Sequence, residues 1–524
     1  MNNSGARDSG LGARGPHLPS LPRRSAKREG GAWTLLYLLS LVPFILLATA
    51  NSAGYRYGAS DLAFYGPAVM RQLDPALFPR DRPVLDAQAN LTFMDETVAA
   101  IARRTTTHLP SLFLGLYIAT LILLAAAVTA IGSTLSLNRW TVVALLAACT
   151  LRHAITKSGT NTLEGYFHPR QLAFAFGLLG VAAFLRGRPL LAVLALVGAG
   201  SLHPTTTLWF AVWLSVAIFA TARVRWPLAA VAAALAVVGW WAFALGPLAG
   251  RLTLMDPEWL DALAGKDYLF PLRWPFTAWL ANLAYGPIIL FAYRRRASLG
   301  LASRAERGLV IGCLALVAVF FVALMLNTAR VALAIQLQPA RIFWMLDFAA
   351  TMYFVWALAE GPPSRFALRV AGMRPAIVAG VLAVLALVRG AYVMRVEFPN
   401  RPLFETGVPG DWGRVAAWAS GTPKDTGWIA DPMHAARYGT SLRMAAARDV
   451  FVEGTKDAAI GMYDRTIAFR TRDRLRELGD VSVLSVEQVR TLGHEYGLGY
   501  FVTEQPFPLP LAFEAGAIRV YRIP

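Results

Sequence analysis

One carboxylate stands where it could act as a general base. Asp61 lies in an aromatic-rich stretch that reads YRYGASDLAFYGP from residue 55 to residue 67. Aromatic neighbours limit the hydration of a carboxylate and raise its pKa towards that of a useful base. The same position suits a helix N-cap, because Ser60 and Asp61 precede an apolar run. The spacing supports both interpretations equally.

A second group of reactive types follows about a hundred residues later. Glu164, His168 and Arg170 fall within seven residues in the stretch EGYFHPR, and His203 stands in a second His-Pro pair. An acid, a histidine and an arginine at the mouth of a helix could bind a phosphate or a metal. No His-x-x-x-His spacing supports the metal. For both histidines we favour a structural role, and Arg170 suits either a phosphate or a snorkelling position at the lipid surface.

Arg341 is the remaining candidate, in the stretch QLQPARIFW from residue 336 to residue 344. At the top of a helix, a fixed guanidinium can hold a phosphate bidentately, for about 1.5 to 3 kcal/mol per charge-assisted hydrogen bond. The alternative is an interfacial anchor, with Trp344 in the aromatic belt of a membrane protein.

The elements that must position these residues are apolar helices. Hydrophobic residues make up 56% of the 524 and charged residues 16%, against roughly 25% charged in soluble domains. This composition excludes an ordinary cytosolic enzyme. Runs near the roughly 20 apolar residues of a membrane-spanning helix occupy residues 32–50, 112–132, 204–222, 227–245, 276–293, 309–327, 342–359 and 375–394. Shorter runs occupy 140–151, 171–185 and 190–202, so we expect eleven spans, with nine as the alternative.

Basic residues indicate the orientation of these spans. Residues 395–524 hold 16 Lys and Arg and 16 Asp and Glu, so the whole excess of +18 precedes them. Arginines gather in the loops 133–139, 186–189, 223–226, 294–308 and 360–374, which the positive-inside rule assigns to the cytosol with the N-terminus. Nucleic-acid binding is not indicated, because the basic clusters lie between hydrophobic runs and not on one soluble face. The candidate residues all fall in the opposite, outer segments. Cys149 and Cys313 lie in apolar runs, and we expect no disulfide.

The composition changes after residue 394. Short strands are expected at 428–430, 500–503 and 518–521, and helices at 458–478 and 486–496. The expected fold is a polytopic α-helical membrane protein with a C-terminal extracytoplasmic α/β domain. Its parts are a disordered basic cytosolic tail (1–31), a transmembrane domain (32–394) with a long first outer loop (51–111), and the α/β domain (395–524), which lacks a catalytic motif.

This arrangement resembles the GT-C superfamily of membrane glycosyltransferases, which use polyprenyl-phosphate sugars as donors. The resemblance rests on a long first outer loop with an Asp soon after the first helix, an acid in the second outer loop and short broken helices. The segments FHPR (167–170), HP (203–204) and QPAR (338–341) look like those of bacterial GT-C-like proteins. The resemblance implies a bacterial inner-membrane enzyme of the inverting type, which transfers a hexose or pentose outside the cytosol.

The resemblance also implies roles for the candidate residues. Asp61 would act as general base or help to hold a metal, Glu164 would orient the acceptor or a divalent cation such as Mg²⁺ or Mn²⁺, and Arg170 or Arg341 would bind the lipid phosphate. His168 and His203 would line the substrate site. Asp61 has no adjacent acid, so the paired-acid form of the first-loop motif is absent and metal dependence stays open. The rival hypotheses are a non-catalytic transporter or assembly protein for lipid-linked glycans, and a membrane anchor for a working α/β domain.

The orientation gives the first testable prediction. A cysteine introduced at Ser441 is expected to react with an impermeant maleimide in cells whose outer membrane is permeabilised, because residues 395–524 should lie outside the cytosol. A cysteine at Ser298, in an expected inner loop, should not react. The reverse labelling pattern would contradict the orientation.

Overall fold

Helices dominate the computed structural model, which describes residues 26–222, 233, 236–237, 239–246, 248–361 and 373–524. Seven helical segments in these residues are long and apolar enough to cross a membrane. They are Gly31–Asn51, Leu109–Thr134, Pro204–Thr221, Phe276–Ser298, Arg304–Thr328, Ala332–Ala359 and Arg374–Glu397. All seven coincide with long spans that the sequence predicted. They are consistent with a polytopic helical membrane protein. The eighth long span that the sequence predicted, 227–245, lies only partly within the described residues.

Several predicted boundaries change. Helix α1 (Ala26–Asn51) begins within the expected tail 1–31, of which residues 1–25 lie outside the described part. The span predicted at 276–293 consists of α12 (Phe276–Leu283) and α13 (Tyr285–Ser298). The remaining long helices are α5 (Leu109–Thr134), α9 (Pro204–Thr221), α14 (Arg304–Thr328), α16 (Ile342–Ala359) and α17 (Arg374–Tyr392), with a π-helical turn at Val393–Glu397.

The three short apolar runs are helices as predicted. They form α6 (Arg139–Cys149), α7 (Pro169–Leu185) and α8 (Pro189–Leu202). Proline occupies the first turn of α7, α8 and α9, where its missing N–H costs no hydrogen bond. Because α7 packs against α5, α8 and α9, its short length does not leave its backbone exposed.

The expected first loop, 51–111, is itself folded. It contains strand β1 (Tyr55–Arg56) and helices α2 (Leu62–Leu73), α3 (Arg82–Ala89) and α4 (Met94–Thr105). Other connections carry the short elements β2 (Ala154–Ile155), β3 (Thr160–Asn161), α11 (Pro257–Ala262), α15 (Ala332–Gln336) and the 3₁₀ turns Asp267–Leu269, Pro271–Arg273 and Pro339–Arg341. Strand β1 pairs in parallel with β4 (Phe404–Glu405), which joins the first loop to the C-terminal segment.

The C-terminal segment is built around a four-stranded sheet with the order β5-β6-β8-β7. Its strands are β5 (Gly427–Ile429), β6 (Leu498–Thr503), β7 (Leu511–Ala515) and β8 (Ile518–Arg522), and only β5 and β6 are parallel. Its helices are α18 (Gly410–Ser420), α19 (His434–Tyr438), α20 (Leu442–Ala446), α21 (Gly454–Ile460), α22 (Arg465–Leu478) and α23 (Val486–Tyr496), with a 3₁₀ turn at Val481–Val483. The sequence analysis missed β7 and α18 to α20, and the single helix that it predicted at 458–478 is two helices, α21 and α22.

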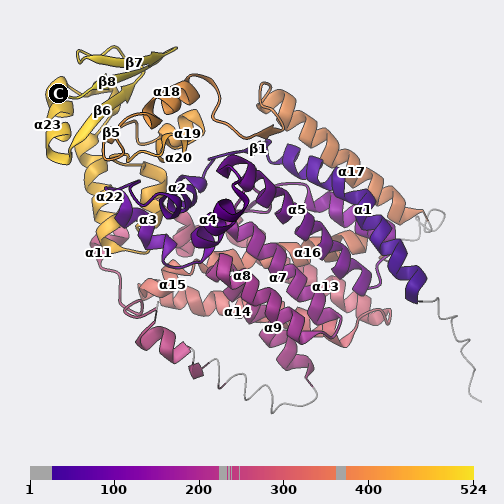
Figure 1. Ribbon diagram of the computed structural model, residues 1–524. Helices are drawn as coiled ribbons and strands as arrows, with labels where there is room; N and C mark the ends of the chain where they lie inside the picture. Colours follow the sequence, from indigo (N-terminus) through magenta and orange to yellow (C-terminus); the bar gives the residue numbers. More distant parts are fainter. Residues whose placement is uncertain (1–25, 223–232, 234–235, 238, 247, 362–372) are drawn as a thin grey trace, which may run out of the picture.

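Alternating residues of this sheet fill two separate cores. Trp428 and Val502 pack with α18 and α20 on one face, whereas Ile429 and Phe501 pack with α22 and α23 on the other. This alternation is the period-2 pattern of a strand buried on both sides. Figure 1 shows the sheet and its helices gathered at one end of the molecule, beyond α2 and α3 of the first loop.

The predicted inner loops also meet one another. Arg186 donates from Nε to Thr134 Oγ1 at 3.1 Å, and Arg296 donates to the Leu135 carbonyl at 3.1 Å. The Asn138 N–H donates to Glu360 at 2.7 Å. Four loops that the charge pattern assigns to one side of the membrane are therefore adjacent in space.

The same structure shows that one labelling position is unsuitable. Ser441 is fully buried, and its hydroxyl donates to Glu453 at 2.5 Å. Val483, which is 76% exposed, replaces it as the position in the C-terminal segment, while Ser298 is exposed and stays. The expected labelling is unchanged: a cysteine at 483 reacts and one at 298 does not.

A buried ion cluster joins the first loop to the C-terminal segment. Arg443 has no exposed side-chain surface and donates to Asp81 at 2.7 Å and to both oxygens of Asp457, at 2.5 and 2.9 Å. Asp81 also accepts from Arg470 at 2.8 Å and from the Val450 N–H at 3.0 Å. Each charged group has several partners, as buried charges require.

We therefore expect Arg443→Met to destabilise the protein strongly. Removing one partner from a buried ion cluster leaves its carboxylates unpaired and typically costs about 3 to 5 kcal/mol. Thermal unfolding of the full chain in detergent, followed by tryptophan fluorescence, measures the loss. Arg414→Met is the matched control, because Arg414 pairs with Asp411 at the surface. Equal melting temperatures for the two variants would contradict the role of the cluster.

Candidate functional site

A pocket of about 240 Å³ collects all six candidate residues. We call it the charged pocket. Its walls come from the segments 60–65, 159–170, 203, 266–268, 338–341 and 455–463. Each of these segments belongs to a part of the chain that the charge pattern assigned to the outer side. In the sequence these candidates lie in four separate places, at Asp61, in the stretch 164–170, at His203 and at Arg341, and the fold brings them together.

Asp61 stands at the N-cap position of α2, but its side chain does not cap the helix. One carboxylate oxygen accepts from Lys456 at 2.5 Å, and the other accepts from His168 Nε2 at 3.0 Å. Burial raises the pKa of Asp61, but Lys456, His168 and Arg170 outweigh it and hold the pKa well below its usual value. The raised pKa expected from the aromatic neighbours is therefore wrong, because Lys456, which lies far away in the sequence, neutralises the effect of burial.

Glu164 and Arg170 form a buried ion pair beside Asp61. Arg170 donates to Glu164 at 3.0 Å and to the Gly159 carbonyl at 3.3 Å, and both side chains are at least 90% buried. This burial excludes the snorkelling interpretation of Arg170. Asn161 also donates to Glu164. Burial raises the pKa of Glu164, although Arg170 and the more distant Arg152 oppose the rise.

The two histidines combine a structural role with a place in the pocket wall. His168 Nδ1 accepts the Arg170 N–H at 3.1 Å at the start of α7, and His203 Nδ1 accepts from the backbone and hydroxyl of Thr206 at the start of α9. Since Nδ1 accepts in each ring, the proton lies on Nε2. Burial, together with Arg170, lowers the pKa of His168 to about 4, and burial with Arg341 holds the pKa of His203 well below its usual value. Both rings are neutral N–H donors at physiological pH.

Arg341 enters the pocket at the start of α16. No carboxylate pairs with it among the described residues, and its Nε is buried without a hydrogen-bond partner. Trp344, one turn later, is 2% exposed and stacks on Phe174 at 3.9 Å. The aromatic-belt interpretation of Trp344 is therefore wrong. Trp344 instead lies under Arg170, whose guanidinium is 5.9 Å from the ring centroid.

The sequence analysis missed the two lysines of the pocket. Lys456, from α21, donates to Ser60 as well as to Asp61. Lys266 donates to the Thr455 carbonyl at 2.9 Å, and burial and the neighbouring Lys456 lower its pKa. Both belong to segments that are polar in sequence and carry no motif. Only the tertiary contact of α21 with the first loop could have identified them.

The charges of the pocket do not balance. Lys456 pairs with Asp61 and Arg170 pairs with Glu164, whereas Arg341 and Lys266 have no carboxylate partner among the described residues. The pocket thus has two unpaired cations and the neutral N–H of His203, since the N–H of His168 already donates to Asp61. These groups favour an anion such as a phosphate. The described residues contain no group of three His, Cys, Asp or Glu side chains that could hold a metal ion, so the divalent cation stays an untested expectation.

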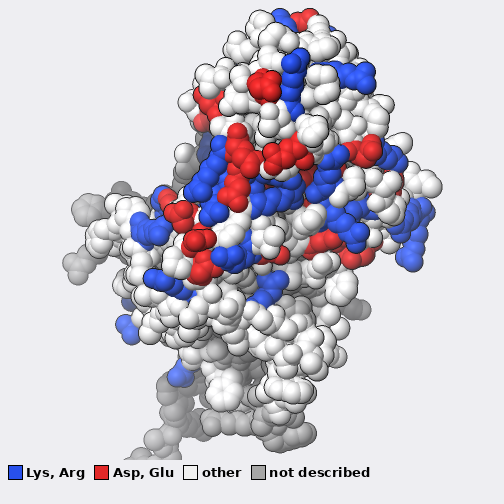
Figure 2. All heavy atoms as spheres, turned by 90° about the vertical axis from the view of Figure 1, so that its left-hand side faces the viewer, with Lys and Arg blue, Asp and Glu red and all other residues white. Residues whose placement is uncertain are grey.

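The surface around this region is strongly charged. In Figure 2, basic and acidic side chains gather in a band across the face that carries the C-terminal segment, and the surface below the band is largely uncharged. A chain that lies in lipid up to the level of such a band would keep its charged groups in water.

Comparison with protein-family models and with curated proteins finds no match.

The pKa of Asp61 gives a prediction that needs no substrate. In Lys456→Met the main opposing charge is gone, so burial should dominate and the pKa of Asp61 should rise. Infrared titration of the protonated carboxyl band, assigned by its loss in Asp61→Asn, should show Asp61 taking up its proton at higher pH than in the wild type. Lys424→Met, which breaks the surface pair with Asp74, is the control. An unshifted Asp61 band in Lys456→Met would contradict the electrostatic account.

Proposed function

We propose that the protein is a membrane glycosyltransferase of the GT-C type, which moves a sugar from a polyprenyl phosphate to an acceptor hydroxyl on the extracytoplasmic side. The observation that carries the proposal is the charged pocket itself. It joins two carboxylates to two unpaired cations where the predicted outer segments meet. Such a transfer needs an anion-binding group for the departing phosphate and a carboxylate for the acceptor proton.

The roles follow from the contacts. Arg341 and Lys266 would bind the phosphate, with the Nε2–H group of His203 as a further donor, because that of His168 already donates to Asp61. Asp61 would take the proton of the acceptor hydroxyl, because its side chain is 26% exposed and that of Glu164 only 7%. A phosphate near Lys456 would compete with Asp61 for the ammonium group and raise the pKa of Asp61, which makes it a stronger base. Glu164 would hold Arg170 in place.

The second candidate is a non-catalytic transporter or assembly protein for lipid-linked glycans. A transporter needs polar residues along a path to the opposite face. Every residue that lines the charged pocket comes from a predicted outer segment. Two cavities that lie among the helices measure about 40 and 20 Å³. His153 and Asp347, which pair at 3.0 Å, line the larger of these cavities beside apolar groups. These features favour the enzyme.

The test begins with the donor and ends with Asp61. Mass spectrometry of lipids that co-purify in mild detergent identifies the polyprenyl-phosphate sugar, and a transfer assay with that lipid follows. A positioned general base contributes about 100- to 10,000-fold in rate, so Asp61→Asn should retain at most about a hundredth of wild-type activity. Because this change leaves Lys456 without its carboxylate, thermal unfolding is measured in parallel.

Asp74→Asn is the matched control for Asp61→Asn. Asp74 lies at the other end of α2 and also pairs with a lysine of the C-terminal segment, Lys424, but at the surface. Its variant should transfer sugar at the wild-type rate. If a folded Asp61→Asn chain kept more than about a tenth of wild-type activity, Asp61 would not be the base, and Glu164, with its raised pKa, would become the leading candidate.

A further inference from the structure

A second pocket lies in the C-terminal segment, and the proposed reaction does not use it. Its volume is about 290 Å³, near the lower end of the roughly 300 to 1,000 Å³ that is usual for small-molecule sites. We call it the strand-end pocket. It is lined by residues 430–434, 437–438, 479–482 and 502–505. They lie after β5, in α19, after α22, and at the end of β6 with the two residues that follow it.

Its position in the sheet is the usual place for a ligand. Strands β5 and β6 are parallel neighbours, and the pocket opens where both of them end. In open sheets with parallel strands, ligands bind in the crevice beyond the carboxyl ends of the strands. On the other side of β5, Val450 forms a parallel bridge with Trp428. The segments on both sides of β5 therefore run in the same direction as β5, and the crevice lies beyond its carboxyl end.

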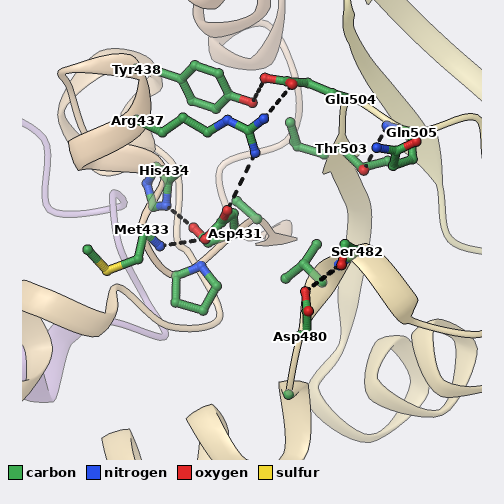
Figure 3. Close-up of a pocket in the computed structure, with 15 residues that line it drawn as sticks. Asp431, Met433, His434, Arg437, Tyr438, Asp480, Ser482, Thr503, Glu504 and Gln505 are labelled. Carbon is green, nitrogen blue, oxygen red and sulfur yellow. Dashed lines mark hydrogen bonds and ion pairs between the residues drawn. The ribbon is translucent and has the colours of Figure 1, made fainter.

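The polar groups of the pocket form a hydrogen-bonded frame. Figure 3 shows Arg437 between two carboxylates: it donates to Glu504 at 2.5 Å and lies 3.7 Å from Asp431. Tyr438 donates to the other oxygen of Glu504 at 2.8 Å. Asp480 faces them from the opposite wall and accepts from the N–H and hydroxyl of Ser482. Carboxylates fixed in this way keep free lone pairs for hydroxyl groups.

The chemistry of the lining selects the class of ligand. Three carboxylates face one guanidinium, which disfavours an anion. Arg437 already pairs with two of the carboxylates, which disfavours a simple cation. Val481, Val502, Pro432 and Met433 add apolar surface. Carboxylate acceptors, a planar donor and apolar patches together match a neutral saccharide, which has hydroxyl edges and C–H faces.

The two pockets share a wall. The Gly454 N–H donates to the Pro432 carbonyl at 3.0 Å, and the Thr455 hydroxyl contacts Met433 Sδ at 3.4 Å. Pro432 and Met433 line the strand-end pocket, whereas Thr455 and Lys456 line the charged pocket. A saccharide chain that leaves the strand-end pocket past Met433, which is 50% exposed, has only the start of α21 to pass before it reaches Asp61.

From this geometry we infer that the strand-end pocket binds a neutral saccharide portion of the acceptor and holds it beside the charged pocket. Saccharide binding follows from the strand-end pocket alone, and its description as an acceptor site rests on the proposed function.

The test uses the full chain in lipid nanodiscs on an array of neutral hexose and pentose oligosaccharides, with sulfated and sialylated glycans on the same array. We expect binding to neutral glycans. Loss of one charged hydrogen-bond acceptor should weaken binding at least about tenfold, so Glu504→Gln and Asp480→Asn should each show such a loss. Among the described residues, the exposed side chain of Asp480 accepts hydrogen bonds from Ser482 alone. Asp480→Asn therefore keeps the test valid if Glu504→Gln unfolds the segment. Glu514→Gln, on β7 and away from the pocket, should bind like the wild type.

The outcomes separate this inference from the proposed function. Binding of a polyprenyl monophosphate to the same nanodiscs, and its loss in Arg341→Gln, reports on the charged pocket alone. No glycan binding, binding of acidic glycans only, or equal binding by Asp480→Asn and Glu514→Gln would overturn the inference, whatever the phosphate result. Glycan binding that is lost in Asp480→Asn would support it even if phosphate binding failed.

Discussion

The buried contact between Arg443 and the carboxylates of Asp81 and Asp457 is the constraint on which the charged pocket depends. Asp81 belongs to the first loop and Asp457 to α21, so a single guanidinium sets the position of one relative to the other. Lys456 precedes Asp457, and Asp61 lies twenty residues before Asp81. The pair between Lys456 and Asp61 at 2.5 Å therefore forms between two segments that the ion cluster has already aligned.

Electrostatics inside the pocket follow from the same alignment. A carboxylate among Phe64, Tyr65 and Tyr166 would have a raised pKa if it stood alone, because burial disfavours its charge. Lys456 reverses this effect for Asp61, whereas the pKa of Glu164 stays raised despite its pair with Arg170. The two carboxylates thus differ in pKa although they share one cavity. This difference keeps Asp61 ionised, which is the form that a carboxylate needs in order to accept a proton.

The sequence predicted the elements better than the contacts between them. Long apolar runs and His-Pro pairs follow from local physics, since a span needs hydrophobic length and a proline suits the first helical turn. Seven spans, the three short helices and the strands at β5, β6 and β8 were predicted on that basis. Helix α18 was missed because Gly413 and Arg414 interrupt its apolar pattern, and strand β7 because Glu514 interrupts the apolar pattern of its five residues. The candidate residues were found because reactive types stood out in otherwise apolar surroundings. Lys456 and Lys266 were missed because lysines in a polar segment carry no local signal.

The position of α21 explains why the C-terminal segment matters to both pockets without a catalytic motif of its own. Its first turn gives Lys456 to the charged pocket, and the residue before Lys456, Thr455, contacts Met433 of the strand-end pocket. A seven-residue helix is too short to be stable alone. Asp457, which accepts two hydrogen bonds from Arg443 and one from the Glu453 N–H at 3.0 Å, fixes this helix in place. A displacement of α21 would therefore change the charge next to Asp61 and the wall of the strand-end pocket at the same time, which couples the two pockets through one short element.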